Sequence, residues 1–170
     1  VEDDLFGSSV DLDGNIAIIG AVGGNSYGTW GGLAFLFDVE TGAEIKQLSA
    51  SRPTLDDWYG TSVAIDGERA IIGAPHYGPT SDGHGAVYIV EVPSGNELLR
   101  LELPDAIEGD EFGFAVDLDG TTALIGAPSR HGMGAAYLFD VSTGALLSQL
   151  LPLPFPQFGD RFGASVALSG

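Results

Sequence analysis

The sequence predicts an all-β protein built from a repeated hairpin module. Phe-Gly or Tyr-Gly dipeptides recur along the chain, and their glycines are Gly7, Gly60, Gly113 and Gly163. A second series of glycines follows the same steps of 53, 53 and 50 residues, at Gly14, Gly67, Gly120 and Gly170. A fixed period near 50 residues marks a repeat architecture, in which each unit buries its apolar surface by stacking on its neighbours.

Each repeat is expected to hold four strands. The first strands are predicted at 6–12, 59–65, 112–118 and 162–168, and the second at 16–21, 70–74 and 123–127. The third are predicted at 33–38, 86–91 and 135–140, and the fourth at 44–48, 97–101 and 146–150. Asp-Gly pairs at 13–14, 66–67 and 119–120 are expected to form two-residue turns with both residues at positive φ. Thr41-Gly42, Ser94-Gly95 and Thr143-Gly144 are expected to turn between strands three and four, with the glycine left-handed.

Short strands at even spacing, with 26 glycines and no helical period, predict a β-propeller of four-stranded antiparallel blades. The chain is one segment, 1–170, with repeats at 4–55, 56–108 and 109–158 and the start of a fourth at 159–170. About three blades and the first strand of a fourth make an incomplete ring, because propellers close at four to eight blades. Each open end would expose a blade face of roughly 300–500 Å². We therefore expect further blades of a longer chain, or self-association, to cover these faces.

Composition excludes several partners. The formal charge is −18, with 24 acidic residues against six lysines and arginines. Binding to nucleic acid needs clustered basic side chains, so it is not expected. No apolar run approaches the ~20 residues of a membrane span, so a membrane-embedded protein is not expected either. The acidity favours cationic partners or divalent metal, or it serves only to solvate the surface.

One end of the blades is predicted to be the binding face. In a four-stranded antiparallel blade, turns 1–2 and 3–4 lie at one end, and connections 2–3 and 4–1 lie at the other. The first two are short and uniform, whereas the last two are long and varied, as binding loops on a rigid scaffold are. The candidate ligand-binding residues are in or beside these connections: Tyr27, Trp30, Trp58, His76, Tyr77, Asp82, His84, Arg130 and His131. His76, Asp82 and His84 are also an alternative transition-metal set.

The repeated motifs resemble FG-GAP repeats, which occur in integrin α-subunit propellers and in many bacterial surface and secreted proteins. Phe-Gly stands at 6–7, 112–113 and 162–163, with Tyr59-Gly60 as the variant, and Gly-Ala-Pro stands at 73–75 and 126–128. Repeat one departs from this pattern with Gly20-Ala21-Val22. The resemblance covers essentially the whole chain and implies a propeller that serves adhesion, ligand display or as an accessory module, outside the cell or on its surface.

The resemblance also implies a calcium site in the turn between strands one and two. The aspartates that match are Asp11 and Asp13, with Asn15, in the first repeat and Asp117 and Asp119 in the third. Ala64 and Ala167 replace the leading aspartate in the other two, and the closing aspartate is missing. Calcium takes six to eight oxygen ligands, so ordinary turn chemistry is the alternative for these carboxylates.

Catalysis is not predicted. Acidic residues in the 4–1 connections, such as Asp56-Asp57 and Asp110-Glu111, are paired carboxylates of the kind that perform acid–base work, but a charge run is more often solvated surface. No serine stands in a nucleophile elbow and there is no cysteine. The sequence favours a non-enzymatic binding or adhesion module for a protein or glycan. The alternatives are an accessory propeller beside a secreted hydrolase and a calcium-binding structural repeat.

Overall fold

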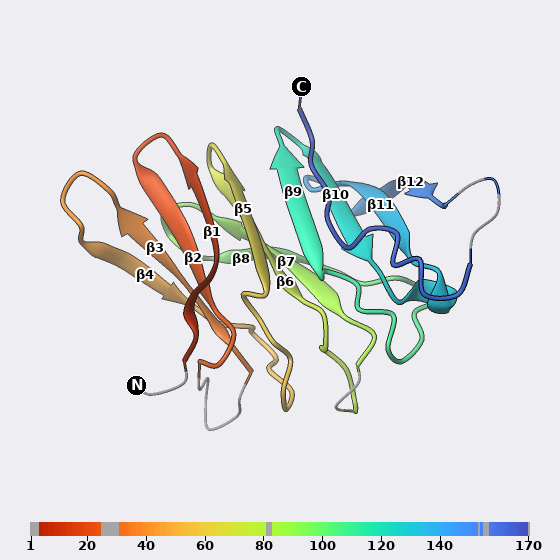
Figure 1. Ribbon diagram of the computed structural model, residues 1–170. Helices are drawn as coiled ribbons and strands as arrows, with labels where there is room; N and C mark the ends of the chain where they lie inside the picture. Colours follow the sequence, from red (N-terminus) through yellow and green to blue (C-terminus); the bar gives the residue numbers. More distant parts are fainter. Residues whose placement is uncertain (1–3, 25–30, 81–82, 153, 155–156, 170) are drawn as a thin grey trace.

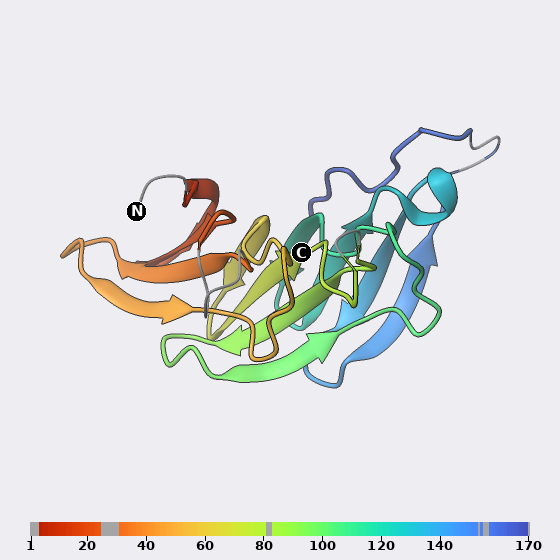
Figure 2. The same ribbon diagram turned by 90° about the horizontal axis from the view of Figure 1, so that it is seen from below.

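The protein forms three four-stranded antiparallel sheets, each with its strands in chain order (Figure 1). The computed structural model describes residues 4–24, 31–80, 83–152, 154 and 157–169. Tyr27, Trp30 and Asp82 of the predicted binding set lie outside these residues. The first strands of the three sheets lie side by side and the fourth strands fan outward, as Figure 2 shows. This is the arrangement of successive propeller blades in a ring that is not closed.

The strand bounds are as follows. Blade 1 consists of β1 (Phe6–Asp13), β2 (Ile16–Ala21), β3 (Leu33–Asp38) and β4 (Glu44–Leu48). Blade 2 consists of β5 (Ser62–Asp66), β6 (Arg69–Ala74), β7 (Ala86–Glu91) and β8 (Glu97–Leu101). Blade 3 consists of β9 (Ala115–Asp119), β10 (Thr122–Ala127), β11 (Ala135–Asp140) and β12 (Ala145–Leu150). The one helical element among the described residues is a 3₁₀ turn at Arg130–Gly132.

The second, third and fourth strands lie where the sequence predicts them, to within one residue, but the first strands of blades 2 and 3 begin three residues late. The aromatic residue that was predicted to open each of them makes a parallel bridge to the preceding blade instead, Gly32 with Tyr59 and Gly85 with Phe112. In the fourth repeat Phe162 makes the same bridge to Gly134, but 162–168 is not a strand. A strand requires a hydrogen-bonded neighbour along its length, and the described residues supply none there.

The turn between the first two strands also differs from the prediction. Asp13 pairs with Ile16 and Asp66 with Arg69, so each aspartate ends its strand and the two turn residues are Gly14-Asn15 and Gly67-Glu68. Only the glycine has positive φ, 54° and 57° in these two turns. A glycine at the first central position is the requirement of a II′ hairpin turn. The turn between strands three and four is as predicted, with φ of 71° at Gly42.

Two apolar cores hold the blades together, one on each side of blade 2. Ile72 of β6 packs toward blade 1, in a core with Leu36 and Tyr59. Ile71, the preceding residue, packs toward blade 3, in a core with Phe112 and Phe139. Since both faces of β6 are buried, its sequence is almost continuously apolar rather than alternating. Tyr59, which replaces the motif phenylalanine in the second repeat, is 1% exposed and belongs to the first of these cores.

The two glycine motifs meet where successive blades touch. The carbonyl oxygen of Gly60 lies 2.0 Å from the point where a Cβ on Gly20 would be, and the Gly113 oxygen lies at the same distance from that point on Gly73. The Gly163 oxygen approaches Gly126 equally closely, at 1.9 Å. Any side chain at Gly20, Gly73 or Gly126 would therefore overlap the backbone of the next repeat. The glycine of Gly-Ala-Pro is required by this contact rather than by its own φ.

We expect Gly73→Ala to lower the free energy of unfolding by about 3 kcal/mol or more, because overpacking against backbone forces the blades apart. The control is Gly42→Asn, where no atom lies within 4 Å of the added Cβ and asparagine tolerates the left-handed φ of 71°. Urea denaturation followed by circular dichroism compares the two. Equal losses of stability would contradict the role given to the contact.

Candidate binding face

The 1–2 and 3–4 turns form one end of the blades, which we call the turn face, and its aspartates join one blade to the next. Asp13 Oδ2 accepts a hydrogen bond of 2.8 Å from the backbone N–H of Gly67, and Asp66 does the same for Gly120. Deeper in the sheet, Asp11 Oδ2 accepts from Ile65 N at 2.8 Å. These carboxylates are used in cohesion between blades.

The leading aspartate alternates with alanine along the repeats. Asp117 accepts from Leu168 N in the fourth repeat, as Asp11 does from Ile65 in the second. Ala64 and Ala167 take the equivalent position in the second and fourth repeats. The N–H that each aspartate reaches therefore belongs to the residue after an alanine.

The five residues of the suggested calcium sites are thus accounted for differently. Asp11, Asp13 and Asp117 accept hydrogen bonds from the next repeat, and the Asn15 carbonyl accepts from Val39 N at 3.0 Å. Asp119 is half-buried at the end of β9. Within the described part of the chain, no three His, Asp or Glu side chains are grouped closely enough to hold a metal ion. Backbone N–H groups of the next repeat are the partners that the structure gives these turns.

The other two connections, 2–3 and 4–1, form the opposite end of the blades, which we call the loop face. The connections from β4 to β5 and from β8 to β9 lie on it, at the lower edge of Figure 1. The sequence suggested that the acidic residues of this face are solvated, but two of them are buried. Asp57 and Asp110 are 0% and 1% exposed. Asp57 accepts from Thr54 N at 2.6 Å, and Asp110 from Ile107 N at 2.9 Å.

These two aspartates belong to a motif that the sequence analysis missed. Aspartate precedes the aromatic residue by two positions in every repeat, as Asp4, Asp57, Asp110 and Asp160. The exposed Asp160 repeats the contact, since it accepts from Gln157 N at 2.7 Å. The full motif is Asp-x-Phe/Tyr-Gly, where x is any residue, and its aspartate closes the turn by which the chain enters the second, third and fourth repeats. The regular spacing was the signal that would have revealed it.

Arg130, a predicted ligand-binding residue, is buried beneath the loop face. Its guanidinium pairs with the Asp110 carboxylate and, through Nη2, with Asp105 Oδ2 at 2.7 Å; Nη1 also donates to the Asp105 carbonyl oxygen at 3.0 Å. The side chain is only 2% exposed. The structure therefore gives Arg130 the role of neutralising a buried carboxylate, which it does from the 3₁₀ turn of blade 3.

The x residue of each motif is held in a left-handed backbone conformation on the loop face. The φ angles are 51°, 58°, 58° and 52° at Leu5, Trp58, Glu111 and Arg161. Left-handed backbone is uncommon for residues other than glycine, and here it recurs in all four repeats. Leu5 and Trp58 are 62% and 42% exposed. The motif thus presents four chemically different side chains at equivalent places.

Trp58 and His76, both in the predicted set, are brought together. Their rings stack with centroids 3.9 Å apart and planes 16° apart. A pocket of about 370 Å³ is lined by Leu5, Val22, Gly23 and Trp58, where blades 1 and 2 meet on the loop face. The pocket is therefore walled by the x residues of two successive repeats.

Tyr77 and His84 form a second group, which is more deeply embedded. The Arg100 guanidinium lies 4.9 Å from the centre of the Tyr77 ring, and the ring meets those of His84 and Tyr88 edge to face at 6.0 and 6.3 Å. His84 Nε2 lies 4.0 Å from Glu102 Oε2. Both Tyr77 and His84 are half-buried, so each side chain packs against its neighbours and is also partly exposed to solvent.

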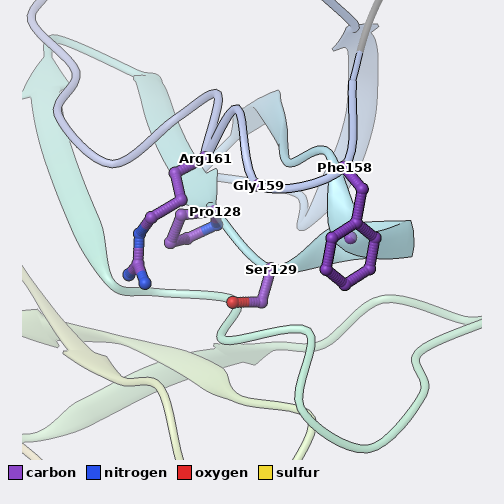
Figure 3. A pocket seen from close by; sticks show the side chains of 6 residues that line it. Pro128, Ser129, Phe158, Gly159 and Arg161 are labelled. Atoms are coloured by element: carbon purple, nitrogen blue, oxygen red, sulfur yellow. The ribbon is translucent and has the colours of Figure 1, made fainter.

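A second pocket, of about 390 Å³, lies where blade 3 meets the fourth repeat (Figure 3). Pro128, Ser129, Gly132, Phe158, Gly159 and Arg161 line it. Ser129 Oγ donates to Glu111 Oε2 at 2.7 Å, and Arg161 reaches the same oxygen at 3.4 Å. His131, the last of the predicted set, is exposed in the adjoining 3₁₀ turn. Unlike the first pocket, this one has a charged residue, Arg161, and a hydroxyl group, that of Ser129, in its lining.

Repeated blades with a cohesive turn face and a varied loop face define a β-propeller repeat protein. The sequence matches the FG-GAP repeat family over residues 1–37, 43–90 and 96–139. The chain belongs to the FG-GAP repeat family. A search of curated proteins found no match. Among the described residues, no helix is long and apolar enough to span a membrane.

Solved structures share the fold. One is the computationally designed protein Ika8, with a TM-score of 0.55 and 19% sequence identity. The alignment covers 84% of this chain and 35% of that protein, so the chain spans about a third of the designed protein's length. At this identity the similarity establishes the architecture alone.

The buried Asp57 carboxylate gives a pH prediction. Burial raises its pKa above the ordinary value, and the hydrogen bonds from Thr54 oppose this only in part. The folded state then binds a proton more tightly than the unfolded state, so this group adds stability as pH falls through the raised pKa toward 3.8. The difference in unfolding free energy between wild type and Asp57→Asn should shift in favour of wild type as pH is lowered from 7 to 4.

Asp140 supplies the control of opposite sign. A hydrogen bond from the Ser142 hydroxyl is the main cause that lowers the pKa of Asp140 below its ordinary value. Its contribution is therefore present above about pH 4 and is lost as pH falls further. Urea titrations at a series of pH values should show opposite trends for Asp57→Asn and Asp140→Asn; parallel trends would contradict the assignment of either group.

Proposed function

We propose that this chain is a non-enzymatic binding module that acts outside the cell or on its surface and uses the loop face to hold a protein partner. The observation that carries the proposal is the contrast between the two ends of the blades. Carboxylates of the turn face accept hydrogen bonds from the next repeat. The loop face instead presents exposed side chains of different chemistry at equivalent positions, as binding surfaces on repeat scaffolds do.

The exposed aromatic group supports this use of the loop face. A tryptophan that is 42% exposed and fixed by a stacked imidazole offers a large contact area at little entropic cost. Such aromatic anchors supply much of the energy of protein interfaces. The pocket beside Trp58 has the volume of a small binding site.

Replacement of Trp58 and His131 together by asparagine should abolish partner binding and leave the melting temperature within a few degrees of wild type. Both residues have positive φ, 58° and 50°, which asparagine tolerates. Tyr77 is retained because it packs on Tyr88. Surface plasmon resonance against arrayed secreted proteins and glycans measures the loss.

The matched control lies on the turn face, where Glu40 and Glu97 are exposed. The variant Glu40→Ala with Glu97→Ala should bind as wild type does. Binding that survives the loop-face change and disappears with the turn-face change would reject the proposal. Binding to glycans and to none of the proteins would contradict the proposal that the partner is a protein.

Further blades of the same kind are proposed to cover the open side of blade 1. Phe6 contacts Phe35 and Phe37 there with ring centroids 5.4 and 6.0 Å apart. The equivalent buried group in blade 3, Phe112 with Tyr137 and Phe139, has both distances at 5.8 Å. The open side thus carries the same aromatic group as a side that a preceding blade covers.

A pair of equivalent valines tests this. Val10 is 67% exposed, whereas Val63, its counterpart in blade 2, is 8% exposed. Val63→Ser should lower the unfolding free energy of the 170-residue chain by about 2 kcal/mol, and Val10→Ser by less than about 0.5 kcal/mol. In a chain with a further repeat fused before residue 4, Val10→Ser should cost as much as Val63→Ser. Equal costs in the shorter chain, or an unchanged Val10 cost in the longer one, would contradict the proposal.

A further inference from the structure

Three junctions between successive repeats open onto the loop face, and their chemistry differs. Each junction is bounded by the x residues of two successive motifs and by the residue that follows the Gly-Ala-Pro position. The first is bounded by Leu5, Gly23 and Trp58, the second by Trp58, His76 and Glu111, and the third by Glu111, Ser129 and Arg161. Because the backbone repeats, the differences between junctions lie in these side chains.

The second and third junctions are already occupied or polar. In the second, the His76 ring lies against Trp58, 3.9 Å from centroid to centroid. In the third, Glu111 Oε2 accepts from Ser129 at 2.7 Å and from Arg161 at 3.4 Å. Arg161, which lines the pocket that Figure 3 shows, is thus paired with a carboxylate in this junction.

The first junction is open and apolar. Gly23 takes the place of His76 and Ser129, so no side chain fills the space, and Val22 takes the place of the proline. The pocket of about 370 Å³ is consequently lined by Leu5, Val22, Gly23 and Trp58, with no charged residue among them. A pocket whose side chains carry one polar group, the Trp58 indole N–H, suits an aliphatic or aromatic group better than a sugar, whose several hydroxyl groups need hydrogen-bond partners.

The walls of this pocket are fixed before any partner arrives. Leu5 and Trp58 both extend from left-handed turns whose backbone is closed by local hydrogen bonds, Leu5 O with Ser8 N and Trp58 O with Thr61 N, each 3.1 Å long. Trp58 is supported on its other side by His76. Little conformational entropy is therefore lost when a side chain enters.

The surroundings of the pocket are acidic. Asp4 directly precedes Leu5, and Asp56 stands two residues before Trp58. The next connection, 102–111, carries five acidic residues, but four of them, Glu102, Asp105, Asp110 and Glu111, are paired with arginines. Arg52 is the one basic residue of the preceding connection, 49–58, and the whole chain has a charge of −18. A partner segment with basic residues is attracted to such a surface.

We propose that the first junction binds an apolar side chain from a basic segment of a partner protein, with Leu5 and Trp58 as the walls of its pocket. This inference rests on the proposed function of the loop face and narrows it to one place and one chemistry. The x residue of the motif is then the position that sets what each junction accepts, since backbone and motif are shared by all of them.

Three synthetic seven-residue peptides test the chemistry. The first has one leucine between two pairs of lysines, with glycine at both ends; the second replaces the leucine with serine, and the third replaces the lysines with glutamates. Isothermal titration calorimetry at about 0.15 M salt, where long-range attraction is screened, measures their affinities for the whole chain. The leucine peptide should bind at least about tenfold more tightly than the serine peptide, and the glutamate peptide should not bind.

Two variants with the same substitution at equivalent positions test the place. The two variants are Leu5→Asn and Arg161→Asn. Both introduce asparagine, which tolerates the positive φ angles of 51° and 52° at these positions. Leu5→Asn should remove the preference for leucine over serine, and Arg161→Asn should leave it within about twofold. Melting temperatures near that of wild type confirm that both variants fold.

Equal affinity for the leucine and serine peptides, or a leucine preference that survives Leu5→Asn, overturns this inference. Neither result touches the loop-face proposal, which is tested separately by the Trp58 and His131 variant and its turn-face control. Loss of the preference in Arg161→Asn instead would move the pocket to the third junction and overturn the first as its place.

Discussion

The close approach of two backbones is the constraint on which the rest of this structure depends. The carbonyl oxygen of each Phe/Tyr-Gly glycine sits where a side chain on the preceding repeat's Gly-Ala-Pro glycine would be, at Gly20, Gly73 and Gly126. Blades that approach this closely bury the intervening aromatic residue, as Tyr59 and Phe112 show. The same approach sets the direction of the chain as it enters each blade. Residues on either side of the motif glycine are therefore placed by contact with the neighbouring blade.

The close packing of the blades explains part of the acidity of the chain, because carboxylates accept hydrogen bonds from backbone N–H groups at and near the contacts between blades. Many carboxylates accept hydrogen bonds from backbone N–H groups, across blades at Asp13 and Asp66 and within the entry turn at Asp57 and Asp110. A carboxylate is well suited to this work because it accepts several hydrogen bonds and donates none. Arg130 balances the charge of the buried Asp110. Some of the carboxylates behind the net charge of −18 therefore stabilise the fold through these hydrogen bonds.

Sequence patterns predicted the strands that are marked by short-range periodicity. They did not predict contacts between residues that are distant in the sequence, such as a hydrogen bond to another repeat. The third strands, such as β3 and β7, agree with their predicted bounds, because each is a compact apolar run between glycines. Asp13 was assigned to the turn because Asp-Gly is a common hairpin pair; its hydrogen bond to Gly67, 54 residues away, holds it in the strand. On the candidate site, Trp58 and His76 were found as loop aromatics, but their stacking was not visible in spacing. Asp57 and Arg130 were interpreted as surface groups because local sequence does not report burial.

The alternation of aspartate and alanine along the first strands has an evolutionary consequence. Asp11 and Asp117 each reach the backbone beside an alanine position of the following repeat. Duplication of a single unit carrying aspartate would set two carboxylates side by side in the middle of the array, where like charges repel. Copying two units at once preserves the alternation. The period of this inter-blade contact is therefore two repeats, although the period of the backbone is one.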